Sequence, residues 1–382
     1  MRPGTPPVRH FTPHIRFPPH MDSHIATSRT GTLAQVVLDR PQALNALSLG
    51  MVRDLYRALT AWRADPAVQA VAIRSSSPRA FCAGGDLRFF HEACRAGLHG
   101  GAEALEDFFT EEYRLDHLIH HYPKPWLVLM DGIVMGGGMG MAQGGASCVR
   151  VVTERARMAM PEVNIGLFPD VGGGRFLSRL PDHVGLYLAL SGEALSAADA
   201  VRIGLADFLL PSARMPALLD ALQQAGDGDV RACIAEAAVS VADADWIEEE
   251  GLSANRSAIA QHFAQDSVAA IADSLRRDDS PFARRTLAAM MQRSPLMLCV
   301  TFRQLKRARE LSLADCLRME RSMIRHCFDH DEVLEGIRAA IIDKDRQPRW
   351  QPAHLDAVTE TMVERFFEPA WPAHLHPLRD LA

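Results

Sequence analysis

The sequence has few cysteines, no excess of basic residues and no long apolar run. Seven cysteines in 382 residues are too few for a disulfide scaffold, and none of them forms a CxxC pair. Reduced thiols in a cytosol-like compartment are therefore expected. Lysine and arginine total 41 against 47 acidic residues, so no net positive charge indicates nucleic acid binding. No apolar stretch reaches about 18 residues, which argues against a membrane span.

Common cofactor and hydrolase motifs are missing as well. The chain contains neither a GxGxxG dinucleotide fingerprint nor a GxxxxGK phosphate loop. It also lacks the HExxH and GxSxG signatures, which weakens a zinc hydrolase and a serine hydrolase as interpretations. We therefore expect no cofactor and no metal site.

The first 30 residues have a composition unlike the rest of the chain. They are rich in proline, histidine and arginine, and prolines at 3, 6, 7, 13, 18 and 19 oppose a helix. We expect residues 1–30 to form a disordered extension. Met21 is an alternative start, and an organellar presequence is another interpretation that the prolines oppose.

From residue 33 onward, short apolar runs alternate with helical periods. The runs typical of strands are 33–38, 68–73, 126–134 and 147–152. Apolar residues at helical spacing cover 48–62 and 103–121. Such alternation, in units of roughly 30 residues, predicts an α/β core with parallel strands over 31–212. Strand signals then stop, so we predict a mainly helical C-terminal region over 213–382.

Two glycine-rich loops each follow a predicted strand. They are Ala80-Phe-Cys-Ala-Gly-Gly-Asp86 and Met135-Gly-Gly-Gly-Met-Gly140. Glycine lets backbone N–H groups approach a ligand, and the helix that the second loop opens gives these groups partial positive charge. Two donors from different loops could meet at one carbonyl oxygen as an oxyanion hole. Close packing of a helix on a strand would explain either loop alone.

Two acids lie eight residues apart in the mostly apolar segment MPEVNIGLFPDVGGG. They are Glu162 and Asp170. Burial raises the pKa of a carboxyl and makes it usable as an acid or base near neutrality. The alternative is structural: Asp170 would cap a helix at 171–180, and Glu162 would be a solvated turn residue.

Taken together, these motifs resemble the crotonase (enoyl-CoA hydratase/isomerase) superfamily. Five segments occur in the order of that superfamily: RPQALNALS, AFCAGGDL, KPWLVLMDGIVMGGG, AMPEVNIGLFPDVGGG and SGEALSAADAVRIGLAD. The resemblance implies a crotonase-like spiral of ββα turns and an acyl-CoA thioester substrate. It also implies that the N–H groups of Gly85 and Gly137 form an oxyanion hole.

The pattern of acids indicates which family within this superfamily the chain resembles. Hydratases of the superfamily carry one Glu just after the GGG turn and a second in the PE segment, whereas this chain has Gly140 and Glu162 there. Asp170 stands where hydratases usually have Gly. An aspartate at position 170 resembles the 3-hydroxyisobutyryl-CoA hydrolase family. The segments FFTEEYRLDHLI and EGIRAAIIDKDRQPRW resemble that family too. That resemblance implies Glu162 and Asp170 as catalytic residues and Glu112, Gly137, Glu162 and Asp170 as substrate-binding positions.

The implied reaction is hydrolysis of a 3-hydroxyacyl-CoA thioester, 3-hydroxyisobutyryl-CoA in valine catabolism. Glu162 either attacks the thioester and forms an anhydride or activates water as a general base, and the sequence leaves both open. Asp170 and Glu112 are candidates to accept a hydrogen bond from the 3-hydroxyl. The alternatives are an enoyl-CoA hydratase or isomerase, and a non-catalytic acyl-CoA-binding subunit.

Several side expectations complete this interpretation. Cys82 and Cys94 are expected to be buried or inert and not nucleophiles. The candidates to meet the CoA phosphates are Arg88, Lys124, Arg175 and Lys344. A composition rich in alanine and arginine suggests a bacterial, cytoplasmic protein, while a eukaryotic one would lie in the mitochondrial matrix. Self-association into a homo-oligomer is left open.

Overall fold

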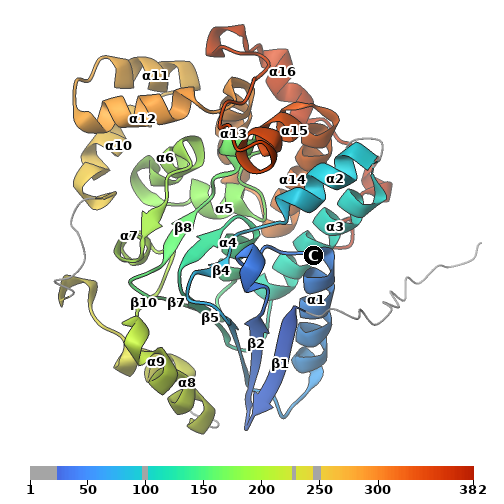
Figure 1. Cartoon of the computed structure of the whole chain (residues 1–382), viewed down its shortest axis with the longest axis vertical. Helices are drawn as coiled ribbons and strands as arrows, with labels where there is room; N and C mark the ends of the chain where they lie inside the picture. The colour runs from blue at the N-terminus through green and yellow to red at the C-terminus, as the bar shows by residue number, and fades with distance from the viewer. Residues whose placement is uncertain (1–23, 97–101, 226–228, 244–250) are drawn as a thin grey trace, which may run out of the picture.

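The strands of the described residues lie in two sheets (Figure 1). The computed structural model describes residues 24–96, 102–225, 229–243 and 251–382. The larger sheet has six strands in the order β1-β2-β3-β5-β7-β10. They are β1 (Ile25–Thr30), β2 (Leu33–Leu38), β3 (Ala70–Ser75), β5 (Trp126–Met130), β7 (Cys148–Val152) and β10 (Phe208–Leu209). All neighbours pair in parallel except the antiparallel β1 and β2.

The smaller sheet has four strands in the order β4-β6-β8-β9. They are β4 (Ala80–Cys82), β6 (Ile133–Met135), β8 (Arg157–Ala159) and β9 (Leu195–Ser196). The chain passes from a strand of the larger sheet to one of the smaller sheet three times, as β3-β4, β5-β6 and β7-β8, and helices follow each pair. The structure therefore confirms the predicted α/β class and its spiral of ββα turns.

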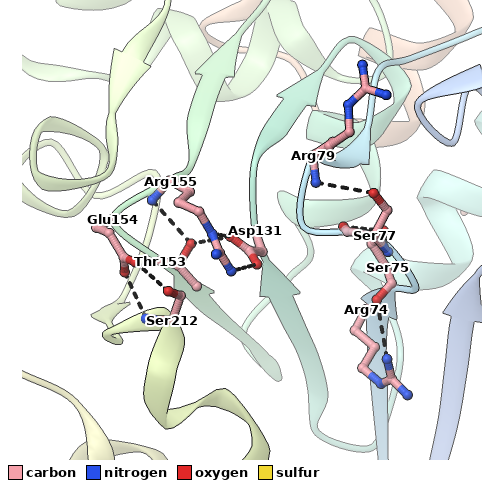
Figure 2. A network of polar contacts seen from close by, with 9 residues as sticks. All are labelled: Arg74, Ser75, Ser77, Arg79, Asp131, Thr153, Glu154, Arg155 and Ser212. Atoms are coloured by element: carbon pink, nitrogen blue, oxygen red, sulfur yellow. Dashed lines mark hydrogen bonds and ion pairs between the residues drawn. The ribbon is translucent and has the colours of Figure 1, made fainter. Parts of the chain in front are cut away.

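A polar corner divides the apolar run 126–134, which was predicted as one strand. The chain turns at Asp131 and Gly132, and Gly132 has a φ of +74°. The Asp131 carboxylate accepts hydrogen bonds from the Thr153 hydroxyl at 2.6 Å and from Nε of Arg155 at 2.8 Å (Figure 2). These contacts fix the point at which the chain leaves the larger sheet for the smaller one.

The first helices of the chain cover the sheets. They are α1 (Leu49–Ala64), α2 (Leu87–Ala96), α3 (Glu103–His120), α4 (Gly137–Ala142), α5 (Gly173–Ser178), α6 (Val184–Ser191) and α7 (Ala197–Arg202). The Ser48 hydroxyl caps α1 by accepting a hydrogen bond from the Met51 N–H. Trp126 of β5 and Phe108 of α3 belong to the main core and are fully buried.

The C-terminal region is helical, as predicted, and it does not form one separate body. Its helices are α8 (Met215–Gln224), α9 (Val230–Ala237), α10 (Arg256–His262), α11 (Val268–Arg276), α12 (Pro281–Met291), α13 (Pro295–Ala308), α14 (Leu313–Asp329), α15 (Glu332–Ile337) and α16 (Glu360–Glu364). Leu218 and Ile234, from α8 and α9, share a second core with Leu127 and Leu129 of β5. In Figure 1, α13, α14 and α15 instead lie beside α2, α3 and α5.

One boundary of the predicted N-terminal extension is wrong. Residues 25–30 form β1, whose six residues pair with β2 from Ile25–Leu38 to Thr30–Leu33. No proline follows residue 19 in this segment, so its N–H groups are free to join the sheet. Residues 1–23 lie outside the described residues. None of the helices in the described part of the chain has both the length and the apolar character that crossing a bilayer requires.

Candidate active site

The two glycine loops lie side by side at the ends of neighbouring strands. β4 and β6 pair in parallel, so the loops that follow them leave the same edge of the smaller sheet. A Cβ atom placed on Gly84 would lie 3.2 Å from the carbonyl oxygen of Met135 and 3.5 Å from the nitrogen of Gly137. In the described residues, no acceptor is hydrogen bonded to the N–H of Gly85 or of Gly137. Two free donors from separate loops thus lie close together.

A preceding segment holds the first loop in this orientation. The N–H of Leu47 donates to the carbonyl of Gly84 at 2.7 Å, and the N–H of Asp86 donates to the carbonyl of Leu47 at 3.0 Å. The fully buried Asn45 donates from its amide to the carbonyls of Ala80 and Phe81. The two backbone bonds use the Gly84 carbonyl and the Asp86 N–H, on either side of Gly85. The N–H of Gly85 itself therefore stays available.

Glu162 faces the second loop. It is the first residue of the short 3-10 helix η3 (Glu162–Ile165) and is 7% exposed. A Cβ on Gly136 would lie 3.0 Å from its Oε1, while its Oε2 has no hydrogen bond partner. Burial, and then the charge of Asp170, raises the pKa of Glu162 well above its ordinary value. The alternative of a solvated turn residue is wrong, since the carboxyl lies inside the protein.

Glu112 approaches the same loop from α3. It is 3% exposed, and a Cβ on Gly137 would collide with its Oε1, which has no hydrogen bond partner. Its neighbour Glu111 lies on the outer side of the helix and forms an ion pair with Arg53. Adjacent acids on one helix therefore have different environments, and only a glycine at 137 leaves room for the Glu112 carboxyl.

Asp170 is also buried, but it does not cap the following helix. Helix α5 has Gly172 at its N-cap and no side-chain cap hydrogen bond from the chain before it. Instead the carboxylate of Glu320, on α14, accepts from the N–H groups of Gly172 at 2.8 Å and Gly174 at 3.1 Å. The Asp170 Oδ2 accepts a 2.7 Å hydrogen bond from the Tyr113 hydroxyl. The capping alternative is wrong, because an acid about 150 residues away takes that position.

Sequence reasoning missed Tyr113, Asp116 and Glu320. Tyr113 and Asp116 lie on α3 near Glu112, and the i, i+4 spacing of Glu112 and Asp116 was a signal that could have placed both acids on one helix face. All three missed residues are buried. Nothing near Glu320 in the sequence indicates its contact with the α5 N-terminus.

The site concentrates carboxyls without cations. Burial is the main cause that raises the pKa of each of its acids, and neighbouring carboxylates raise most of them further. The acids are Glu112, Asp116, Glu162, Asp170 and Glu320. Within the described ranges, no lysine, arginine or histidine forms an ion pair with them, and no set of three ligating side chains is arranged to hold a metal. Carboxyls of this kind exchange protons near neutral pH, which suits acid–base or nucleophilic chemistry.

Asp170 differs from the neighbouring acids in its pKa. Burial raises its pKa to about 6, while the hydrogen bond from Tyr113 opposes that rise. Burial raises the pKa well above its ordinary value in three other acids, Glu112, Asp116 and Glu162. The site therefore brings together carboxyls whose environments set different pKa values, as sites that use several acids in different roles do.

The remaining sequence candidates do not join this cluster. Burial raises the pKa of the Cys82 thiol to about 12, which makes it a poor nucleophile. The Lys124 ammonium donates to the carbonyls of Trp62 and Asp65 and so binds the C-terminal end of α1. Arg88 and Lys344 are exposed, and Arg175 is partly buried.

A cavity elsewhere in the molecule is not lined by the predicted site residues. It has a volume of about 1180 Å³ and lies between α6, α7, α12 and the short 3-10 helix η7 (Ser253–Asn255). Its lining includes Arg157, Tyr187 and Arg285 but none of the acids described above. The glycine loops and the buried acids, and not this cavity, therefore define the candidate site.

The chain is similar to known proteins over most of its length. A sequence model described as enoyl-CoA hydratase/isomerase matches residues 33–367. The mitochondrial 3-hydroxyisobutyryl-CoA hydrolase of Xenopus tropicalis is 38% identical, over 93% of this chain and 91% of that protein. The one of Homo sapiens is 36% identical, over 93% of this chain and 92% of that protein.

Two solved structures are also similar. A carnitinyl-CoA dehydratase from Mycobacterium thermoresistibile has a TM-score of 0.84 and 38% identity, and covers 92% of this chain and 98% of its own. An enoyl-CoA hydratase from Rhodobacter sphaeroides 2.4.1 has a TM-score of 0.80 and 36% identity, and covers 91% of this chain and 98% of its own.

Proposed function

The chain belongs to the enoyl-CoA hydratase/isomerase family, and from that premise we propose that it hydrolyses 3-hydroxyisobutyryl-CoA to 3-hydroxyisobutyrate and CoA. Relatives named 3-hydroxyisobutyryl-CoA hydrolase, 36–38% identical over most of the chain, support an acyl-CoA thioester hydrolase. With this substrate the enzyme would act in valine catabolism. The named relatives are mitochondrial proteins, and the location of this one stays a prediction.

The observation that carries the proposal is the position of Glu162 opposite two free N–H donors. Its Oε1 lies against Gly136, and the unpaired N–H groups of Gly85 and Gly137 belong to the adjoining loops. In the proposed reaction these N–H groups bind the thioester carbonyl oxygen and stabilise the charge that develops on it. Losing one such donor costs about 3 kcal/mol of transition-state stabilisation.

Glu162 then supplies the attacking oxygen or prepares it. In one course its carboxylate attacks the carbonyl carbon, the C–S bond breaks, and water later cleaves the anhydride. In the other, Glu162 takes a proton from a water molecule that attacks directly. Either way one water is consumed, and the CoA thiolate leaves easily because its thiol has a pKa near 8.5.

Asp170 and Glu112 would recognise the 3-hydroxyl of the acyl group. The Asp170 carboxylate, ionised and held by Tyr113, can accept a hydrogen bond from that hydroxyl. Glu112 has an unpartnered Oε1 beside Gly137. An acyl group without the hydroxyl would leave these buried oxygens unpaired, so the site would discriminate against it.

A hydratase is the second candidate, because the similar solved structures are titled as a dehydratase and a hydratase. Position 140 argues against it. A Cβ on Gly140 would lie 2.7 Å from the Cβ of Val171 and 2.9 Å from Oδ1 of Asp116. The glutamate that hydratases carry there by resemblance is absent, and this site has no room for it. A subunit that only binds acyl-CoA would have no use for buried, unpaired carboxyls, which cost stability.

Thiol release separates the candidates. We expect the protein to release CoA from 3-hydroxyisobutyryl-CoA and to leave crotonyl-CoA unhydrated. Glu162→Gln should lower thiol release by about a thousandfold or more while the fold is retained. Glu154→Gln is the matched control, since Glu154 bonds Ser212 outside the site. Normal thiol release by Glu162→Gln would contradict the mechanism, and rapid hydration of crotonyl-CoA would favour the second candidate.

A further inference from the structure

Helix α3 carries a second buried acid, Asp116, that the proposed function does not use. Asp116 lies four residues after Glu112 on the same helix face and is 5% exposed. Neither Oδ1 nor Oδ2 has a hydrogen bond partner in the described residues. Leaving a buried acceptor unpaired costs about 1–3 kcal/mol, and more for a charged group. A bound ligand would supply the hydrogen bond partner that this side chain lacks.

Helix α4 shows where Asp116 lies relative to the glycine loop. Three glycines of this turn each meet a different carboxyl: Gly136 faces Glu162, Gly137 faces Glu112, and Gly140 faces Asp116. Oδ1 of Asp116 would lie 2.9 Å from a Cβ on Gly140, which is one helical turn beyond Gly136. The three carboxyls therefore line one side of α4, beginning at the end that carries the proposed oxyanion donor.

The other neighbours of Asp116 come from the turn before α5. A Cβ on Gly140 would lie 2.7 Å from the Cβ and 2.9 Å from the Cγ2 of Val171, so Val171 lies beside the same position as Asp116. Val171 has a φ of +50°, which a β-branched residue rarely adopts, and it directly follows Asp170. Strained backbone of this kind tends to persist at functional sites. Asp116 thus lies near both α4 and the turn that carries Asp170.

We propose that Asp116 is a further specificity-determining residue, which together with Glu112 binds the hydroxyl of the acyl chain. The inference rests on the proposed function. A hydroxyl both donates and accepts a hydrogen bond. In the proposed function Asp170 accepts the hydroxyl proton, and a carboxylic acid on Glu112 or Asp116 offers the donor to the hydroxyl oxygen. Acyl groups without a hydroxyl leave both buried groups unpaired.

The charges around the pair favour a shared proton. Burial raises the pKa of Glu112 and of Asp116 well above their ordinary values. Asp170 raises both further, and Glu162 or Glu320 adds to the effect on one or the other. No cation among the described residues pairs with either acid. Both shifts favour a proton on the pair, which the proposed donor requires.

The test compares acyl-CoAs that differ only in the hydroxyl. kcat/KM for thiol release is measured with 3-hydroxyisobutyryl-CoA and with isobutyryl-CoA for the intact protein and for Asp116→Asn. We expect the ratio of the two values to fall about tenfold or more in the variant, with the isobutyryl-CoA value unchanged or raised. Asp107→Asn, on the outer side of α3 with its partner Arg53, is the matched control and should leave the ratio unchanged.

A structural role would give a different result. If Asp116 only supported the fold, both substrates would lose activity together and the ratio would stay constant, which would overturn the proposal. Should Asp116→Asn fail to fold, the smaller Asp116→Ser is measured for the same ratio, and collapse of both variants would also overturn it.

A binding measurement keeps this inference separate from the proposed function. Dissociation constants are measured for non-hydrolysable thioether analogues of the two acyl-CoAs. A hydroxyl preference that Asp116→Asn removes would support the inference even if the intact protein released no thiol. Thiol release with an unchanged binding preference in Asp116→Asn would sink the inference and leave the proposed function standing.

Discussion

The Tyr113 hydroxyl donates a 2.7 Å hydrogen bond to Oδ2 of Asp170, joining α3 to the turn before α5. Both residues are buried, and the bond stabilises the ionised form of Asp170 against the effect of burial. It therefore separates Asp170, whose pKa is about 6, from Glu162, whose pKa lies well above its ordinary range. One hydrogen bond thus helps to give two nearby acids different pKa values.

Tyr113→Phe should shift the pH dependence of thiol release. Without the donor, the pKa of Asp170 rises above about 6, so the acidic limb of kcat/KM moves to higher pH. Hydrogen bonds to charged groups are worth about 1.5–3 kcal/mol, which corresponds to roughly tenfold to hundredfold in rate near neutrality. The measurement is thiol release between about pH 5 and pH 9.

Tyr122→Phe is the control for this variant, because the Tyr122 hydroxyl is also buried and donates to the Leu59 carbonyl, outside the site. It should lose a similar amount of stability and keep the acidic limb in place. An unmoved limb in Tyr113→Phe would show that Asp170 does not control the rate.

The unfolding free energy should fall as the pH rises from about 6.5 to about 8. Burial raises the pKa of Glu332 to about 7 and that of Glu320 to about 8, so the folded state holds protons that the unfolded state has lost. Each such group contributes up to about 1.4 kcal/mol per pH unit. Histidines with a lowered pKa, such as His120 at about 4, act in the opposite direction only below about pH 6.5.

Urea unfolding at pH 6.5 and pH 8 measures this slope. Glu320→Gln removes one of the titrating groups and should make the slope shallower. A stability that is constant or rises across the window would contradict the assignment of raised pKa values to the buried acids.

Gly138→Ala should damage the site through packing. A Cβ there would lie 2.6 Å from the carbonyl oxygen and 2.9 Å from the Cβ of Cys82, so α4 would have to move away from β4. Overpacking of this kind costs about 1–3 kcal/mol, and the shift would also displace the Gly137 N–H and slow thiol release.

The matched control is Gly50→Ala, also in a helix, where the nearest atom would be 3.8 Å away. It should stabilise the fold by roughly 0.4–1 kcal/mol. Equal melting temperatures for the two variants would mean that α4 and β4 are less tightly packed than the contacts indicate.

The C-terminal segment should contribute to the stability of α3. Leu378 is fully buried, and the guanidinium of Arg114 on α3 donates to the Pro377 carbonyl and to Asp380. Leu378→Ala is expected to cost about 2–5 kcal/mol. Leu375→Ala, at a position that is 57% exposed, should change stability by less than about 0.5 kcal/mol. Thermal unfolding of the two variants measures the difference, and a small loss in Leu378→Ala would show that the segment is not required.

Much of the fold followed from patterns within a few residues. The apolar run that became β2 and the helical spacing that became α1 and α3 were readable because backbone hydrogen bonding and side-chain direction repeat locally. The glycine loops were readable for the same reason. The break at Asp131-Gly132 was missed although the Asp-Gly dipeptide is a turn signal, because the apolar residues around it suit one long strand.

The motifs and their order predicted an α/β spiral, an acyl-CoA substrate and the two acids of the PE segment through the family resemblance that they carry. Contacts between distant segments settled the surroundings of those acids. Tyr113 meets Asp170 across 57 residues, Glu320 caps α5 from α14, and Asp116 fills the space beside Gly140. Burial, charge and hydrogen bonding at a site depend on which chain segments pack together, and local spacing carries no information about that.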